Sequence, residues 1–172
     1  MNELKIPELS LVVLVGISGS GKSTFAKRVF KQTEVISSEK CRGMVADEEN
    51  NQTAATDEFE LLHYVAAKRW QNGHLTVVDA TNVQTEARRL LVQLAQKYHC
   101  LSVAIVLDVP EKICQARKEE RLDRNFEKHV FGHQRSPLKR SIKNLKKEVL
   151  RKVHESVLGV MALESQAVDP RL

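Results

Sequence analysis

Short apolar runs alternate along the chain with longer segments in which apolar residues recur every three to four positions. Runs of this length are typical of buried strands, and the longer segments are typical of amphipathic helices. The runs expected to form strands are 11–15, 34–38, 75–79 and 101–107. The segments expected to form helices are about 22–31, 56–72 and 85–98. This alternation predicts an α/β fold around a central parallel sheet of four or five strands.

The pattern is less regular after residue 110. Residues up to about 148 look helical, with a break near 132–137 where glycine and proline interrupt the periodicity. Segment 151–161 has five apolar residues without clean alternation, so a strand and a helix both stay open there. A length of 172 residues fits one domain. We expect residues 1–172 to be a single domain excised from a larger multidomain protein.

Residues 16–23 read Gly-Ile-Ser-Gly-Ser-Gly-Lys-Ser and lie between the first predicted strand and the first predicted helix. Glycines at this spacing let backbone N–H groups turn toward phosphate oxygens, and the helix N-terminus adds partial positive charge. Lys22 would reach the β- and γ-phosphates, and the Ser23 hydroxyl would ligate Mg²⁺. A plain Gly/Ser-rich turn is the alternative, which the spacing and both flanks disfavour. The predicted ATP-binding residues here are Gly16, Ser18, Gly19, Ser20, Gly21, Lys22, Ser23 and Thr24.

Asp79 ends the third predicted strand. A carboxylate at the carboxyl end of a strand beside a phosphate-binding loop can hold Mg²⁺, so we predict that Asp79 and Ser23 form the metal site. The alternative is that Asp79 caps the next helix, a role that Asn82 or Thr85 can also fill.

Glu39 follows the second predicted strand, and Arg42 comes three positions later. A helix beginning here would place both side chains on one face. Glu39 is then a candidate to take a proton from an attacking hydroxyl, and Arg42 to hold a phosphate of the acceptor. The alternative is a surface ion pair between the two residues.

Arg117, Arg121 and Arg124 recur at i, i+4 and i+7, on the same face of one predicted helix. Arginines that close over a nucleotide stabilise the charge that spreads over a transferred phosphoryl group. The spacing therefore predicts a helical lid over roughly residues 111–137 that contributes these arginines to ATP binding. Solvated surface arginines are the alternative.

The net charge of +5 is unevenly distributed, because residues 111–152 hold fourteen Lys or Arg against six Asp or Glu. Beside a nucleotide-binding loop, this favours a polyanionic partner over a plain solvated face. The three cysteines lack C-x-x-C spacing, and no apolar run nears the ~18–20 residues of a membrane span. We expect a cytoplasmic protein without a membrane partner.

The motifs also exclude several classes of nucleotide-binding protein. The Asn-Lys-x-Asp with which GTPases recognise guanine is absent, and so is the Leu-Ser-Gly-Gly-Gln of transport ATPases. A motor ATPase with its sensor elements needs a longer chain. A small kinase remains.

The order of these motifs resembles the amino-terminal 5′-kinase domain of bacterial polynucleotide kinase-phosphatases, enzymes of RNA end-healing and sealing. The resemblance covers about residues 4–148. Its most specific part is the Ser-Ser-acid-x-Cys-Arg segment together with Asp-Ala-Thr-Asn. The segments that carry it are LSLVVLVGISGSGKS (9–23), VISSEKCRG (35–43), LTVVDATN (75–82) and the arginines of 117–124.

The resemblance implies a P-loop NTPase fold and transfer of the ATP γ-phosphate to the 5′-OH end of RNA or DNA, with Mg²⁺ or Mn²⁺. It places the general base on Glu39, acceptor binding on Arg42 and Thr81, and lid contacts to the donor phosphates on Arg117 and Arg121. Lys22 and Ser23 keep their loop roles. Phosphatase and ligase domains are expected downstream in the full-length protein.

Two features depart from the family pattern. Glu39 stands where the family has Asp, and one extra methylene moves the carboxylate by about 1.5 Å, enough to change a rate about 10²-fold. The clear last strand of the family is not evident beyond Glu148. Two alternatives therefore stay open: another small kinase that acts on a metabolite, and a catalytically weak module that binds nucleotide or RNA.

Overall fold

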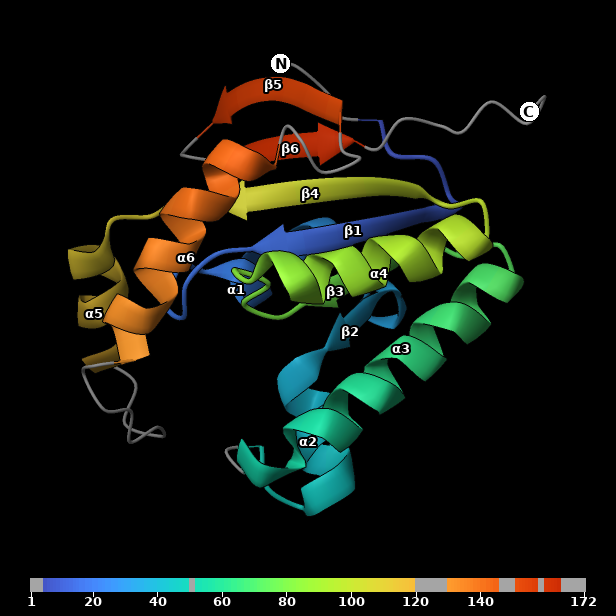
Figure 1. Ribbon diagram of the computed structural model, residues 1–172, viewed down its shortest axis with the longest axis horizontal. Helices are drawn as coiled ribbons and strands as arrows, with labels where there is room; N and C mark the ends of the chain where they lie inside the picture. Colours follow the sequence, from blue (N-terminus) through green and yellow to red (C-terminus); the bar gives the residue numbers. More distant parts are fainter. Residues whose placement is uncertain (1–4, 50–51, 120–129, 146–150, 158–159, 165–172) are drawn as a thin grey trace.

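The computed structural model describes residues 5–49, 52–119, 130–145, 151–157 and 160–164. Its centre is a six-stranded sheet in the order β2-β3-β1-β4-β6-β5 (Figure 1). The first four strands of this order are parallel, which confirms the predicted α/β fold. They are β2 (Val35–Ser37), β3 (Thr76–Asp79), β1 (Ser10–Val15) and β4 (Leu101–Leu107).

Within the segment left open at 151–161, the described residues form strands. β5 (Arg151–Val157) and β6 (Val160–Glu164) pair with each other antiparallel, and β6 extends the sheet by pairing antiparallel with β4. A register shift interrupts the β5–β6 ladder between Val153 and Val157. Regular alternation is not required of strands held by a long-range partner such as β4, and this explains why periodicity did not identify them.

Helices connect the parallel strands, and those expected at about 22–31, 56–72 and 85–98 lie close to their expected places. The described helices are α1 (Lys22–Val29), α2 (Ser38–Ala46), α3 (Ala55–Gln71), α4 (Thr85–Lys97), α5 (Glu111–Glu119) and α6 (Val130–Asn144). The expected break at 132–137 is wrong, because α6 continues through Pro137. Proline inside a helix costs about 3 kcal/mol, and the fully buried Leu138 next to it provides packing energy that offsets this cost.

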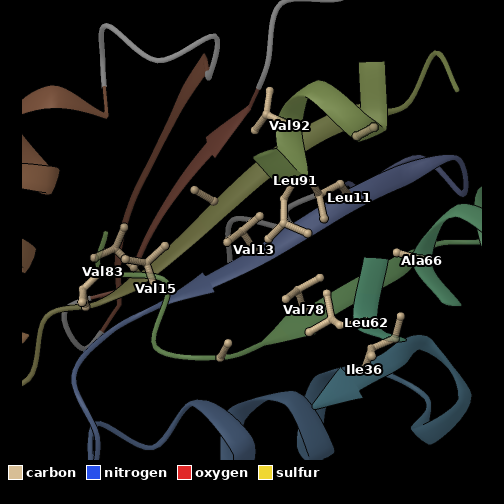
Figure 2. Close-up of a cluster of buried hydrophobic side chains, with 14 of the residues drawn as sticks. Leu11, Val13, Val15, Ile36, Leu62, Ala66, Val78, Val83, Leu91 and Val92 are labelled. Atoms are coloured by element: carbon tan, nitrogen blue, oxygen red, sulfur yellow. The ribbon is translucent and has the colours of Figure 1, made fainter. Parts of the chain in front are cut away.

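The two faces of the sheet carry separate hydrophobic cores, because alternate residues of a strand point to opposite sides. Leu11 and Val13 of β1 pack with Leu62 of α3 and Leu91 of α4 on one face (Figure 2). Val12 of β1 packs on the other face, in the cluster that includes residues of α1, β3 and β4. Burial on both faces fixes the central strand, and therefore the loop at its carboxyl end.

Among the described residues, no helix has the length and apolar character that a membrane crossing requires.

Candidate nucleotide-binding site

The loop between β1 and α1 depends on two glycines with positive φ. Gly19 has φ 82° and Gly21, which caps the N-terminus of α1, has φ 93°. These are left-handed conformations that L-residues with a side chain rarely adopt. A Cβ on Gly19 would also lie 2.5 Å from the carbonyl oxygen of Cys114 in α5. The loop therefore packs directly against α5.

Lys22 begins α1 and is folded over the loop that precedes it. Its Nζ donates hydrogen bonds to the carbonyl oxygens of Gly16 (2.9 Å) and Ile17 (3.1 Å), and the residue is buried. These two carbonyls belong to the β1 end of the loop. The ammonium group thus lies against the loop, and its role toward β- and γ-phosphates stays a prediction.

Asp79 lies at the edge of the sheet next to this loop, paired in register with Leu14 of β1. Burial raises the pKa of its carboxyl, a hydrogen bond from Ser23 and the charge of Lys22 lower it, and the charge of Glu39 raises it again. Asp79 therefore lies beside the Ser23 hydroxyl, as predicted for a metal site. The alternative that Asp79 caps the next helix is wrong, because the N-cap residue of α4 is Gln84.

These oxygens fit a Mg²⁺ ion, which is usually held by one or two protein oxygens together with substrate phosphates and water. No group of three or more His, Cys, Asp or Glu that could hold a metal occurs within the described ranges. A cation bound by Asp79 and Ser23 would therefore take its remaining ligands from the nucleotide and water.

The turn after β3 is fastened to the loop by backbone and buried side-chain contacts. The N–H of Gly16 donates to the carbonyl oxygen of Thr81 (3.1 Å), and the Asn82 amide donates to the carbonyl oxygen of Leu14 (2.9 Å). Asn82 itself has φ 47°. Arg88 of α4, which is fully buried, donates to the carbonyl oxygen of Asn82 (2.7 Å). Sequence analysis missed this role of Arg88, because nothing in a helical pattern marks an arginine as buried.

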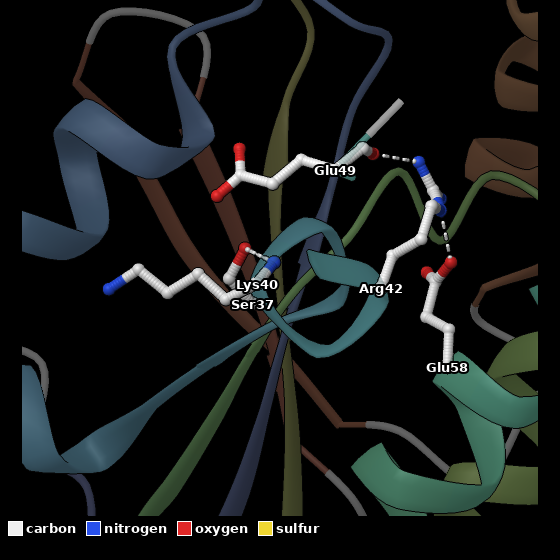
Figure 3. A network of polar contacts seen from close by, with 5 residues as sticks. All are labelled: Ser37, Lys40, Arg42, Glu49 and Glu58. Atoms are coloured by element: carbon white, nitrogen blue, oxygen red, sulfur yellow. Dashed lines mark hydrogen bonds and ion pairs between the residues drawn. The ribbon is translucent and has the colours of Figure 1, made fainter. Parts of the chain in front are cut away.

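On the other side of the site, α2 carries Glu39 and Arg42. Glu39 is half-buried and lies close enough to Asp79 for its charge to raise that pKa. The Nε of Arg42 lies 2.6 Å from Oε2 of Glu58 in α3, and another Arg42 nitrogen donates to the carbonyl oxygen of Glu49 at 2.8 Å (Figure 3). Glu58 is 1% exposed. This buried partner of Arg42, sixteen positions away, was not foreseen.

Two helices on the carboxyl-terminal side reach the loop. Arg117 of α5 is exposed, and its guanidinium lies 3.5 Å from the carbonyl oxygen of Ser20. From α6, Gln134 accepts a hydrogen bond from the N–H of Ser18 at 2.9 Å. Arg117 was predicted, whereas Gln134 was missed because no motif contains it. Arg121 and Arg124 lie outside the described residues.

The loop after β1, the lysine at the start of α1 and the carboxylate at the end of β3 define a P-loop nucleotide-binding domain. A family model described as an AAA domain, AAA_33, matches residues 11–145. The chain belongs to this family. No curated protein matches the chain by sequence.

Solved structures give the same fold. A chain of the Pnkp1/Rnl/Hen1 RNA repair complex aligns with a TM-score of 0.69 and 20% identity, over 91% of this chain and 54% of that one. The Mycobacterium tuberculosis APS kinase CysC aligns with a TM-score of 0.52 and 22% identity, over 76% and 75%. A gluconokinase from Sinorhizobium meliloti 1021 aligns with a TM-score of 0.53 and 17% identity, over 77% and 76%. This chain therefore spans about half of the repair protein that it resembles.

Proposed function

We propose that this protein is an ATP-dependent polynucleotide 5′-hydroxyl kinase that acts on RNA or DNA ends. The observation that carries the proposal is that Glu39, just after β2, and Lys22, at the start of α1, both lie close enough to Asp79 at the end of β3 for their charges to act on its carboxyl. A candidate base for an acceptor hydroxyl thus stands beside the groups suited to the triphosphate. The similarity to a chain of an RNA repair complex adds to this.

On the donor side, ATP would lie on the loop amides with Lys22 at its β- and γ-phosphates. Ser23 and Asp79 would hold Mg²⁺ or Mn²⁺, which supplies charge neutralisation at the phosphate oxygens. Arg117, already near the loop, would stabilise the charge that develops during transfer.

On the acceptor side, the carboxylate of Glu39 would take the proton of the 5′-hydroxyl as its oxygen forms a bond to the γ-phosphorus. The bond from that phosphorus to the β,γ-bridging oxygen breaks in line, and ADP leaves. Arg42, held by Glu58, would bind a phosphate of the polynucleotide, with Thr81 at the same side.

The proposal is tested with γ-labelled ATP and 5′-OH oligonucleotides of RNA and DNA. We expect label on the oligonucleotide and a loss of about 10²-fold or more in Glu39→Ala, the usual contribution of a general base. Lys40→Ala, an exposed neighbour on α2, is the matched control. An unlabelled oligonucleotide with the wild-type protein contradicts the proposal.

A kinase for a small metabolite is the second candidate, and a specific observation favours it: the metabolite kinases align over about three quarters of their own length. Adenylylsulfate and gluconate in the same labelling assay separate the two candidates. Strong salt dependence of acceptor binding is expected only for a polynucleotide.

The third candidate is a weak or non-catalytic module, and the variant Glu39→Asp tests it. Transfer that appears only when the side chain is shortened to Asp would show that Glu39 makes the natural domain a binding module. A wild type that transfers phosphate at least as well as Glu39→Asp would rule out this third candidate. The phosphatase and ligase domains expected downstream, and the cytoplasmic location, belong to the same proposal.

A further inference from the structure

One polar contact between α6 and the loop has no place in the proposed reaction. The N–H of Ser18 donates to the side-chain oxygen of Gln134, 116 positions away in sequence, at 2.9 Å. Loop amides of this kind are the groups that bind phosphate oxygens. Gln134 therefore lies against a donor that a bound nucleotide is expected to use.

The position of Gln134 is fixed by the core. Leu138 lies one helical turn further along α6, is fully buried and belongs to the same hydrophobic cluster as Leu11 and Val13. Leu145, just past the end of α6, is fully buried in that cluster as well. Gln134 itself is only half-buried, so its carboxamide borders the site from a firmly packed helix.

The contacts of Lys22 indicate which phosphate of the nucleotide Gln134 faces. Lys22 contacts the carbonyl oxygens of Gly16 and Ile17 at the β1 end of the loop. Since this lysine serves the β- and γ-phosphates, the β1 end of the loop is the end nearest the γ-phosphate. Ser18 is the next residue, so its N–H and Gln134 lie at that end too.

We propose that Gln134 is a donor-binding residue that recognises the γ-phosphate of ATP. A carboxamide carries an acceptor oxygen and an NH₂ donor on one planar group. Its oxygen accepts from the N–H of Ser18 in the structure. Rotation of the amide presents the NH₂ instead, so that a γ-phosphate oxygen accepts from both Ser18 and Gln134. Gln134 thereby distinguishes a triphosphate from a diphosphate.

This inference rests on the proposed function only in requiring that ATP binds. Its test is calorimetric titration of the β,γ-imido analogue of ATP, and separately of ADP, both with Mg²⁺. The proteins compared are the wild type, Gln134→Met, Gln134→Glu and the control Ser136→Ala, an exposed position on the same helix. No acceptor is present, so a failure of the polynucleotide proposal leaves the result unchanged.

We expect Gln134→Met to bind the triphosphate analogue about 10-fold more weakly, the effect of one hydrogen bond to a charged group, and to bind ADP within twofold of the wild type. Gln134→Glu keeps an acceptor for Ser18 but repels phosphate, so its loss is larger and again confined to the triphosphate. Equal losses for both nucleotides, or tighter binding of both, overturn the proposal. Thermal melting identifies an unfolded Gln134→Met, in which case Gln134→Glu alone decides.

Discussion

The proposed nucleotide side of the site is built mainly on one strand–loop–helix segment, whereas the proposed acceptor side is assembled from two separate helices. Loop 16–21 is fixed by the buried strand before it and by contact with α5. Arg42 is fixed instead by an ion pair to Glu58 of the following helix and by a hydrogen bond to the carbonyl oxygen of Glu49. Damage to the first arrangement should therefore abolish all activity, and damage to the second should affect the acceptor alone.

The largest effect is expected for Lys22→Met on the nucleotide side. The variant removes a buried ammonium that contacts the Gly16 carbonyl and that we propose binds the phosphates, so we expect kcat/KM for phosphoryl transfer to fall by about 10³-fold with every acceptor. Labelling kinetics measure it, and Lys97→Met, at an exposed position of α4, is the control. A fall in kcat/KM that is confined to polynucleotide acceptors would show that Lys22 does not act on the donor.

Glu58→Gln probes the acceptor side. It leaves the Arg42 guanidinium without its charged partner, and we expect kcat/KM for the oligonucleotide to fall by about 10²-fold while the Kd for ATP stays unchanged. The free energy of unfolding should drop by about 1–3 kcal/mol, less than for a fully buried pair, because Arg42 is 13% exposed. Glu60→Gln, exposed on the same helix, is the control. Weaker ATP binding in Glu58→Gln would mean that the two sides are not independent.

Gly19→Ala tests the nucleotide side again, with a smaller expected effect on ATP binding, and Gly73→Ala is its control. Both glycines have positive φ, but a Cβ on Gly19 would lie 2.5 Å from the Cys114 carbonyl oxygen, whereas a Cβ on Gly73 would meet no atom beyond its chain neighbours within 4 Å. Gly73→Ala should lose about 1 kcal/mol of stability. Gly19→Ala should lose more and bind ATP about 10-fold more weakly. Equal effects in calorimetry and melting would show that the contact with α5 does not support the loop.

Asp79→Asn should cause the smallest change, a modest rise in the thermal stability of the protein measured without metal. Burial raises the pKa of Asp79, so the folded state keeps its proton to a higher pH than the unfolded chain does. Stability therefore declines as pH rises from the ordinary Asp pKa through the raised one, and Asn escapes this decline.

We expect the Asp79→Asn variant to melt a few degrees above the wild type at pH 7 and nearer to it at pH 3.5, since about 1 kcal/mol shifts Tm by 2–4 °C in a protein of this size. Differential scanning calorimetry without nucleotide or metal measures this. A lower Tm of Asp79→Asn at pH 7 would contradict the conclusion that burial of the charged carboxylate destabilises the protein. Nucleotide binding in the presence of Mg²⁺ should weaken in the same variant.

The same contrast explains what sequence alone could predict. The parallel strands, the connecting helices and loop 16–23 depend on periodicity and on local spacing, so they were found close to their observed bounds. Asp79 and Glu39 could be predicted as site residues because each follows a parallel strand, and the carboxyl ends of such strands meet at one edge.

The contacts that sequence analysis missed all join distant segments. Glu58 is an acidic residue in an acidic stretch, Arg88 lies within a helical pattern, and Gln134 belongs to no motif. Only the fold shows that Glu58 and Arg88 are buried and that Gln134 reaches Ser18. The strands after residue 150 escaped for the same reason, because β4 supplies their partner.

All three thiols of the chain are buried and reduced: Cys41 in α2, Cys100 just before β4 and Cys114 beneath the loop. Burial raises the pKa of Cys100 to about 11, and it also raises that of Cys41, so these two rarely present the reactive thiolate. Alkylation of the native protein must therefore wait for local opening. The alkylation rate of Cys114 should therefore report how often α5 separates from the loop, and the alkylation rate of Cys41 should report how often α2 frays.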